Sequence, residues 1–309
     1  MRVACITALL CLCAAVAVAD EAEPARHELR EAWEQDYLYT LHEVETVAGT
    51  TKFREPRKDG GENILTGGVT DKHDRTYEYS PTAFDDAGCT RIAVSVVKHH
   101  LERTEHPPGE SGSRNTWNAE GPFTGAAWHE DWKTDHWKRS LTKAARSPWG
   151  EFPDELLKAV AVKRHSRMHF MLPGRAVAVD ETWKPEARHI LAGFKQFQRD
   201  DQSPELEIEC KLAGADEARA VITLKWKAEK LAPVKSDTGA NWKQGVKVEI
   251  EGKATLTLNR KDRFVEKFES ETTAKLEGEL WNSTHWLPTE SVVKTTRVVT
   301  TTRKKVESK

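Results

Sequence analysis

The sequence predicts an α+β protein built on a large, mostly antiparallel β-sheet with two or three packing helices. Apolar and polar side chains alternate with a period of two over much of the last hundred residues, as half-buried strands require. The hydrophobic fraction is 38% and the charged fraction is 31%, which favours antiparallel sheet with one wet face over buried parallel strands. Helical spacing is confined to three short segments before residue 170.

The first nineteen residues, 1–19, predict a signal peptide. Arg2 is followed by an apolar run, and the run ends in Ala17-Val18-Ala19, the small-x-small form that signal peptidase cleaves. The run is also short for a membrane span. We therefore expect cleavage near Ala19 and an extracytoplasmic location, periplasmic or secreted. The mature chain, residues 20–309, is expected to form a single β-rich domain without a transmembrane span.

The next hundred residues predict one helix and two strands. Three large apolar side chains spaced four residues apart follow Pro24, which suits a first helical turn, and predict a short amphipathic helix over residues 24–36. Residues 39–47 predict a strand. Residues 90–101 predict a second strand that is apolar on both faces and therefore central in its sheet.

Residues 102–125 have no period, contain several prolines and glycines, and predict an exposed loop. A sub-boundary within the domain would fall in this loop. Helical spacing returns over residues 128–146 and predicts a second helix. Pro153-Asp154-Glu155 predicts the start of a third, because acidic residues favour the first helical turn.

The carboxy-terminal third predicts successive strands with one face apolar and the other polar. The polar run Asn259–Asp262 predicts the turn of a hairpin between two of them. The alternation is weaker in the last strand, which is dense in valine and threonine. The predicted strands cover residues 205–211, 219–228, 245–258, 263–276 and 291–303.

Two cysteines remain after the predicted cleavage, because Cys5, Cys11 and Cys13 leave with the signal peptide. Cys89 and Cys210 are therefore a disulfide candidate in an oxidising compartment. The alternative is that each is a buried thiol that packs as a small hydrophobic side chain.

The charge balance excludes a strong electrostatic partner. The whole chain has 47 basic and 49 acidic residues, and loss of Arg2 changes the formal net charge from −2 to −3. Charges of both signs are mixed along the chain, so we expect no nucleic-acid partner. The sequence contains no nucleophile elbow, phosphate-binding loop, dinucleotide fingerprint or Cys-x-x-Cys motif. It predicts no cofactor and favours a protein that is not an enzyme.

One segment is rich in metal-ligating residue types, namely His129, Glu130, Asp135 and His136. A catalytic zinc helix places its two histidines four residues apart, so that both rings project from one face. Here the histidines are seven residues apart, and on a straight helix about 10 Å of rise separates them. A helix whose neighbouring tryptophans dock on the sheet explains the same residues.

Two segments resemble exported bacterial proteins of unknown function. Residues 172–184 resemble their Leu-Pro-x-x-Pro-Val-x-Val-Gly-Asp-x-Trp pattern, with Asp180 at the glycine position, and residues 252–258 with Arg263-Phe264-Val265 resemble their hairpin. The resemblance covers residues 147–303. It implies a fold like the curved antiparallel sheet of periplasmic lipoprotein carriers, so the sheet expected here is a large curved one. It implies no catalytic residues.

These observations favour an exported, non-catalytic cell-envelope protein whose apolar sheet face binds a hydrophobic small molecule or an envelope protein. The chain has eleven tryptophans, more than a small core needs. An alternative is a metal-dependent envelope hydrolase that uses the segment from His129 to His136. A third interpretation is that the tryptophans only fill the space between helices and sheet.

Overall fold

The computed structural model describes residues 24–86, 88–108, 115–121, 123–133, 136–143, 146–147, 150–151, 171–185, 205–231, 246–281 and 286–306. The predicted signal peptide and the predicted helix at Pro153 lie outside these residues. Among the residues described, no helix is long and apolar enough to cross a membrane.

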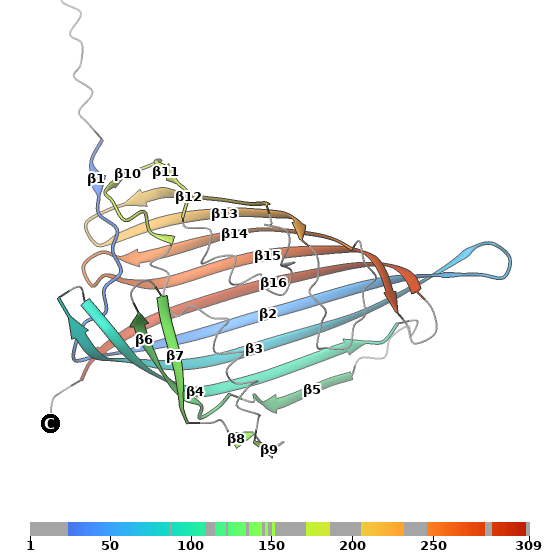
Figure 1. The fold of residues 1–309 in the computed structure, drawn as a ribbon, viewed down its shortest axis with the longest axis horizontal. Coiled ribbons are helices and arrows are strands. Elements are labelled where there is room, and N and C mark those ends of the chain that lie inside the picture. Colours follow the sequence, from blue (N-terminus) through green and yellow to red (C-terminus); the bar gives the residue numbers. More distant parts are fainter. Residues whose placement is uncertain are drawn as a thin grey trace, which may run out of the picture.

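Twelve strands form one large sheet in which every neighbouring pair is antiparallel (Figure 1). The carboxy-terminal strand β16 lies between β15 and β2, so the two ends of the chain meet in the middle of the sheet. Strand β5 (Asn115–Glu120) pairs with β4 beside β6. The other strands follow one another in the order β11 (Thr182–Trp183), β12 (Glu205–Ala215), β13 (Arg219–Leu231), β14 (Lys247–Asn259), β15 (Phe264–Trp281), β16 (Trp286–Lys305), β2 (Tyr37–Pro56), β3 (Glu62–Asp85), β4 (Gly88–His106), β6 (Ala127–Lys133) and β7 (His136–Lys143).

Two short strand pairs lie outside the main sheet. Strand β1 (Arg26–His27) pairs with β10 (Val177–Ala178), and β8 (Arg146–Ser147) pairs with β9 (Gly150–Glu151). Figure 1 shows that β6 and β7 cross over one end of the main sheet, whereas β5 runs along its edge beside β4.

The predicted α+β class is wrong, because the described part of the chain is almost entirely strand and contains no helix. Residues 24–36 contain no helix: Arg26 and His27 pair with β10, a turn at residues 35–36 precedes β2, and Leu29 and Trp33 pack on the end of the sheet. The segment predicted as a helix over residues 128–146 is the β6–β7 hairpin. Its aromatic residues favour strand once β4 offers a partner edge.

The strands predicted from alternation are confirmed, and most are longer than predicted. The β14–β15 hairpin closes where expected, and Asn259 organises its turn. The Asn259 Oδ1 atom accepts a hydrogen bond from the backbone N–H of Asp262 at 2.8 Å, and its Nδ2 atom donates to Glu266 at 3.0 Å. Arg263 takes a left-handed conformation with φ 53°. A side chain that caps its own turn is the reason asparagine favours such positions.

Strand β3 was not predicted, although it is one of the longest in the sheet. Its centre carries Asp71, His73 and Arg75 toward the core side of the sheet, so the apolar alternation is lost there. The predicted loop over residues 102–125 is also wrong in part. Residues 102–106 continue β4, and residues 115–120 form β5.

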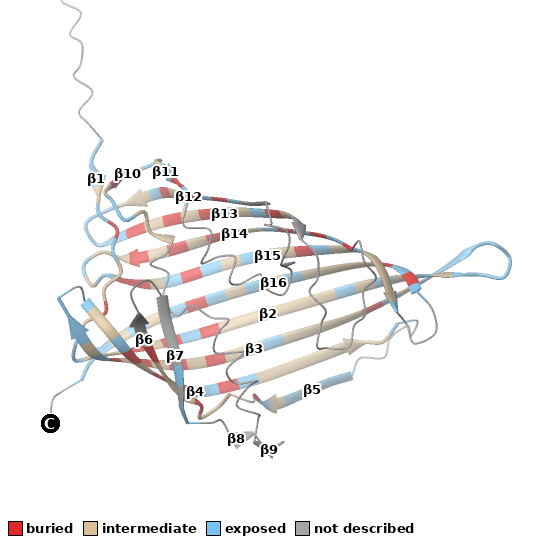
Figure 2. Ribbon diagram, in the orientation of Figure 1, coloured by how far each residue is buried: buried red, intermediate tan, exposed pale blue. Residues whose placement is uncertain are grey.

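The main core lies on one face of the sheet, here called the inner face, near the end that β6 and β7 cross (Figure 2). Side chains from β12–β16 and from β2–β4 meet there in one buried cluster. Leu29 and Trp33 of the amino-terminal segment join it. The Trp33 ring lies 4.4 Å from the ring of Tyr39 and 5.5 Å from that of Tyr79, centroid to centroid.

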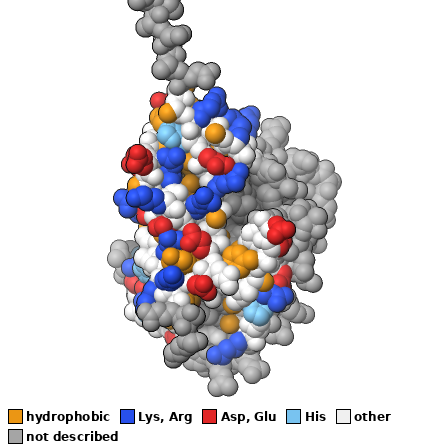
Figure 3. All heavy atoms as spheres, turned by 90° about the vertical axis from the view of Figure 1, so that its left-hand side faces the viewer, with side chains coloured by type: hydrophobic (Ala, Val, Ile, Leu, Met, Phe, Trp, Pro, Cys, Tyr) orange, Lys and Arg blue, Asp and Glu red, His pale blue; other side chains and the backbone are white. Residues whose placement is uncertain are grey.

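The opposite, outer face is polar. Lysines, glutamates and threonines alternate along β14 and β15 and pair across the strands, as in the ion pair of Lys253 with Glu271 at 2.9 Å. Figure 3, which looks at the end of the sheet that lies on the left in Figure 1, shows basic and acidic side chains interspersed there as well. Because positive and negative side chains alternate on neighbouring strands, they pair with one another and produce no large electrostatic potential of one sign.

The inner face contains a close contact that predicts a large effect of one methyl group. The Trp226 ring lies so close to Gly252 on the next strand that an added Cβ would stand 2.3 Å from it. We expect Gly252→Ala to lower the free energy of unfolding by about 1–3 kcal/mol, because the indole must move out of its packed position. Urea unfolding measures the change. The matched control is Gly214→Ala, where a Cβ meets no atom within 4 Å and which we expect to change stability by less than about 0.5 kcal/mol.

Candidate functional site

A group of charged side chains lies on the inner face beside the core. We call it the charged belt; it consists of Glu43, Glu45, His73, Arg75, His99 and Arg297. Glu43, Arg75 and His99 are almost completely buried, with 2%, 4% and 2% of their surface exposed. Burial of so many charges requires that they satisfy one another.

Arg75 is the centre of the belt. Its Nη1 atom donates to Glu43 Oε1 at 3.1 Å and to Glu45 Oε2 at 2.9 Å. Arg297 approaches Glu43 from the other side, with Nε 3.2 Å from Oε1. The Nε atom of Arg75 donates to His99 Nε2 at 3.4 Å. The belt therefore joins β16, β2, β3 and β4 in one network across four strands.

The register of the strands explains why these residues meet. Glu43 pairs with Arg75 and Glu45 pairs with His73 across β2 and β3, while Arg75 pairs with His99 across β3 and β4. Residues two apart on a strand share a face. The register of the strands, together with a polar residue at each inward position, is therefore sufficient to bring the residues of the belt together.

Next to the belt, Asp71 precedes His73 on the inner face of β3. Its partial burial raises the pKa of the carboxyl above the ordinary value, although the nearby Arg103 opposes the shift. Burial disfavours the charged form of a carboxyl. The Nε atom of Arg103 lies 3.4 Å from Asp71 Oδ1, so an ion pair adjoins the belt on this part of the inner face.

The segment that joins β5 to β6 packs on His99. We call its described residues, Gly121 and Phe123–Ala126, the connector. The Phe123 ring stacks on the imidazole with centroids 5.3 Å apart and planes 6° apart. The backbone N–H of Gly121 donates to the carbonyl of His99 at 2.7 Å, and Thr124 Oγ1 accepts from the N–H of His99 at 3.1 Å. An added Cβ on Gly121 would stand 2.2 Å from the imidazole.

A second apolar cluster lies farther along the inner face, away from the core. We call it the distal apolar cluster. It is formed by small and branched side chains on β13, β14 and β15 and the residue before β14, with Leu276 and Val293 packed against it. Its members are Ala228, Val246, Val248, Ile250 and Ala274. Glycines 49 and 278 occupy inner-face positions in the neighbouring rows.

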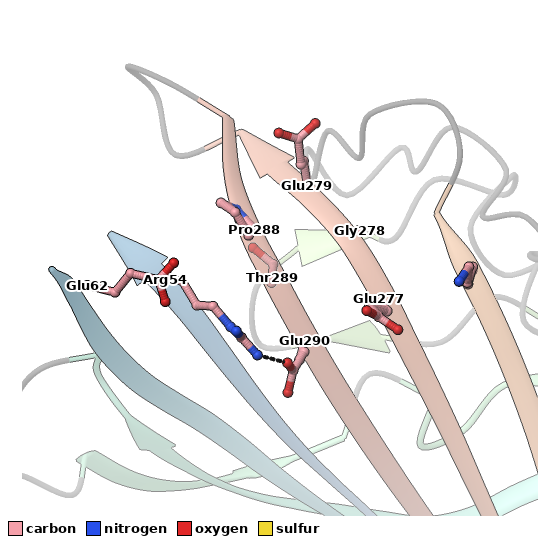
Figure 4. A pocket seen from close by; sticks show the side chains of 9 residues that line it. Arg54, Glu62, Glu277, Gly278, Glu279, Pro288, Thr289 and Glu290 are labelled. Carbon is pink, nitrogen blue, oxygen red and sulfur yellow. Dashed lines mark hydrogen bonds and ion pairs between the residues drawn. The ribbon is translucent and has the colours of Figure 1, made fainter. Parts of the chain in front are cut away.

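The outer face has a hollow of about 380 Å³ where β15, β16, β2 and β3 come together (Figure 4). Charged side chains line it, and Arg54 and Glu290 form an ion pair within it. Two of the lining side chains are basic, Arg54 and Lys247, and four are acidic, Glu62, Glu277, Glu279 and Glu290.

The predicted metal-ligating segment is a strand hairpin. His129 and Glu130 are adjacent on β6, so their side chains point to opposite faces. Glu130 is buried on the inner face and accepts a hydrogen bond from Trp128 Nε1 at 3.1 Å. Asp135 and the side chain of His136 lie outside the described residues. Among the side chains that are described, no group of three His, Cys, Asp or Glu could hold a metal ion.

Cys89 and Cys210, the disulfide candidate, are free thiols in the structure. Both contribute to the main core, Cys210 from β12 and Cys89 from the start of β4. The predicted bridge is therefore not present, and the two thiols follow the alternative of small packed side chains. Burial, with a smaller effect from Glu209, raises the pKa of the Cys210 thiol to about 12.

We expect native mature chain prepared without reductant to protect Cys210 from a thiol reagent such as DTNB at pH 8, because its thiolate is scarce and its sulfur is covered. In denaturant, two thiols per chain should react. Native Cys89→Ser protein should show no reactive thiol, which assigns any native reaction to Cys89. Zero thiols in denaturant would instead demonstrate the bridge.

The segment that carries the family resemblance forms β10 and β11. Asp180, at the glycine position of that pattern, has φ 68°, a left-handed conformation that glycine adopts readily. Trp183 is buried and donates from Nε1 to the carbonyl of Met171 at 2.9 Å. Its backbone pairs with Cys210 on β12. The large antiparallel sheet that the resemblance implied is confirmed.

Comparison with known proteins identifies no family. No protein-family model matches the chain, and no curated protein matches it. Among solved structures, it is similar to one described as "Lipid-protein interactions in lipovitellin", with 9% sequence identity and a TM-score of 0.41. The similarity covers 89% of this chain and 26% of that chain, so this protein spans about a quarter of the length of the lipovitellin chain.

Proposed function

We propose that the protein is an exported, non-catalytic binding protein that takes up an apolar small molecule against the distal apolar cluster. The observation that carries this proposal is the presence of two separate apolar clusters on one face of the sheet. The main core stabilises the fold. The distal cluster lies beyond it on the same face, where the side chains are small and carry no polar atoms.

The composition of the distal cluster supports an apolar ligand. Its members are alanine, valine and isoleucine side chains, each at most 9% exposed, so a ligand lying against them would contact apolar atoms only. Between this cluster and the main core, the inner face carries Thr272 and Thr295, which are paired across β15 and β16. A ligand held by apolar contact alone needs no catalytic group, and binding pockets for such molecules are predominantly apolar.

The experiment is native mass spectrometry of the purified mature chain, residues 20–309, after incubation with palmitate. We expect a bound species, and we expect Ala274→Phe to weaken binding at least about tenfold by filling the cluster. The matched control is Ala48→Phe on the outer face, which should bind as the wild type does. Circular dichroism establishes that both variants are folded.

Two results would count against the proposal: no bound palmitate in the wild type, or equal loss in both variants. If palmitate is not bound and a protein from the envelope is retained in a manner blocked by Ala274→Phe, the face is a protein-docking surface and the small-molecule proposal is wrong.

A further inference from the structure

The imidazole of His99 packs against Phe123 and Gly121 of the connector, and its hydrogen-bond partners define its protonation state. The Nε2 atom of His99 accepts from Arg75 Nε at 3.4 Å and lies 3.2 Å from Nδ1 of His73. Arginine Nε always carries a proton, so it can only donate. The Nε2 atom of His99 must therefore present a lone pair, and the ring is neutral in this arrangement.

Protonation of His99 would remove that lone pair. The new N–H would face a guanidinium N–H and a second imidazole, and the imidazolium would lie beside the permanent charge of Arg75. Two like charges at this separation in a buried site repel strongly. The ring has little room to adjust in place, because Phe123 stacks on it and Gly121 lies against it.

The surrounding charged groups offer limited compensation. Among the described residues, His73 and Arg75 from β3 contact the His99 ring; Glu43 and Glu45 from β2 lie behind them on Arg75, Arg297 from β16 lies beyond on Glu43, and the connector contributes no titratable side chain. Glu43 is bound by both arginines, and Glu45 is bound by Arg75. A first proton on His73 is tolerated, because His73 Nδ1 can still donate to His99. A proton on His99 Nε2 is not tolerated, because it would face the N–H of Arg75.

We propose that His99 is an acid-sensitive latch, and that protonation of its ring releases the connector from the inner face. The effect of release extends beyond the connector, because the connector links β5 to β6 and is hydrogen-bonded to β4. The backbone of Val96 on β4 donates to Ala126 at 2.9 Å and accepts from Gly125 at 2.8 Å. Release would free the edge of β4 at the point where its partner changes from β6 to β5.

Hydrogen exchange of residues 119–127 tests the latch in the mature protein. After correction for the intrinsic pH dependence, we expect exchange of the connector amides to be at least about tenfold faster at pH 5 than at pH 7.5. His99→Phe keeps a ring that can stack on Phe123 but cannot be protonated, and should abolish this pH dependence. The matched control, His42→Phe on the outer face, should retain it.

A second measurement decides the matter if His99→Phe does not fold. In wild-type protein with isotope-labelled histidine, the ring signal of His99 should change to the imidazolium form over the same pH range in which the connector amides lose protection. Equal protection at both pH values would overturn the latch. So would a His99 ring that becomes protonated while the connector amides stay protected, or a pH dependence that persists in folded His99→Phe.

Discussion

Replacement of Arg75 with methionine is expected to lower the free energy of unfolding by about 3–5 kcal/mol. The guanidinium is the shared partner of Glu43 and Glu45, and Glu43 is almost completely buried. Methionine fills similar volume but removes the guanidinium from a buried carboxylate that keeps its contact with Arg297. Urea unfolding at pH 7.5, monitored by tryptophan fluorescence, measures the loss.

The control for this variant is Arg54→Met. Arg54 also pairs with a glutamate across neighbouring strands, but its side chain is 45% exposed. An exposed ion pair contributes little, so we expect a change of less than about 1 kcal/mol. The double variant Arg75→Met, Glu43→Gln should recover part of the loss, since it removes the uncompensated charge. If Arg75→Met is no worse than Arg54→Met, the charged belt does not stabilise the fold in the way described.

Replacement of Trp33 with alanine is the second large effect, again about 3–5 kcal/mol. The indole is 7% exposed and packs on Tyr39 and Tyr79 at the end of the sheet. No other part of the extended amino-terminal segment has so large a side chain in the core. Loss of the indole should also speed hydrogen exchange of the Ala32 amide, which donates to the carbonyl of Arg263 at 2.6 Å.

Trp117→Ala is the matched control, because Trp117 lies on strand β5 with 40% of its surface exposed. We expect a change below about 1 kcal/mol. Similar destabilisation by the two substitutions would mean that Trp33 is not an anchor of the core. A large loss of stability without faster exchange at Ala32 would mean that the segment is held by other contacts.

The strands that could be predicted are those in which the alternation of apolar and polar residues shows which face is buried and which is exposed. In β14 and β15 most of the side chains that face inward are apolar, with Ser270 and Thr272 as exceptions, and those that face water are mainly Lys, Glu or Thr. Asn259 adds a local signal for the turn. Local pattern and tertiary structure agree there, so a single sequence is sufficient.

The remainder depends on partners that are distant in the chain. In β3 the inward residues His73 and Arg75 look like the solvent side of a strand. Their burial is made tolerable by Glu43, Glu45 and His99 on the neighbouring strands. The charged belt was therefore missed along with the strand that carries it. The helix predicted around Trp128 and Glu130 was wrong for a similar reason. Strand β4 supplies an edge with which β6 pairs, and this tertiary pairing prevails over the helix-like spacing. The two side chains therefore share a face of β6.

The position of β16 has a consequence for the order in which the molecule can assemble. The chain leaves the ribosome amino-terminus first, yet the long edge of β2 pairs along its length with residues 289–305, which are made after all the other strands of the sheet. Until then β2–β4 and β12–β15 are two separate sheets, each with an open edge that can pair with another chain. Because their union requires contacts across almost the whole sequence, we expect slow, late folding and a need for protection from aggregation before the final strand is available.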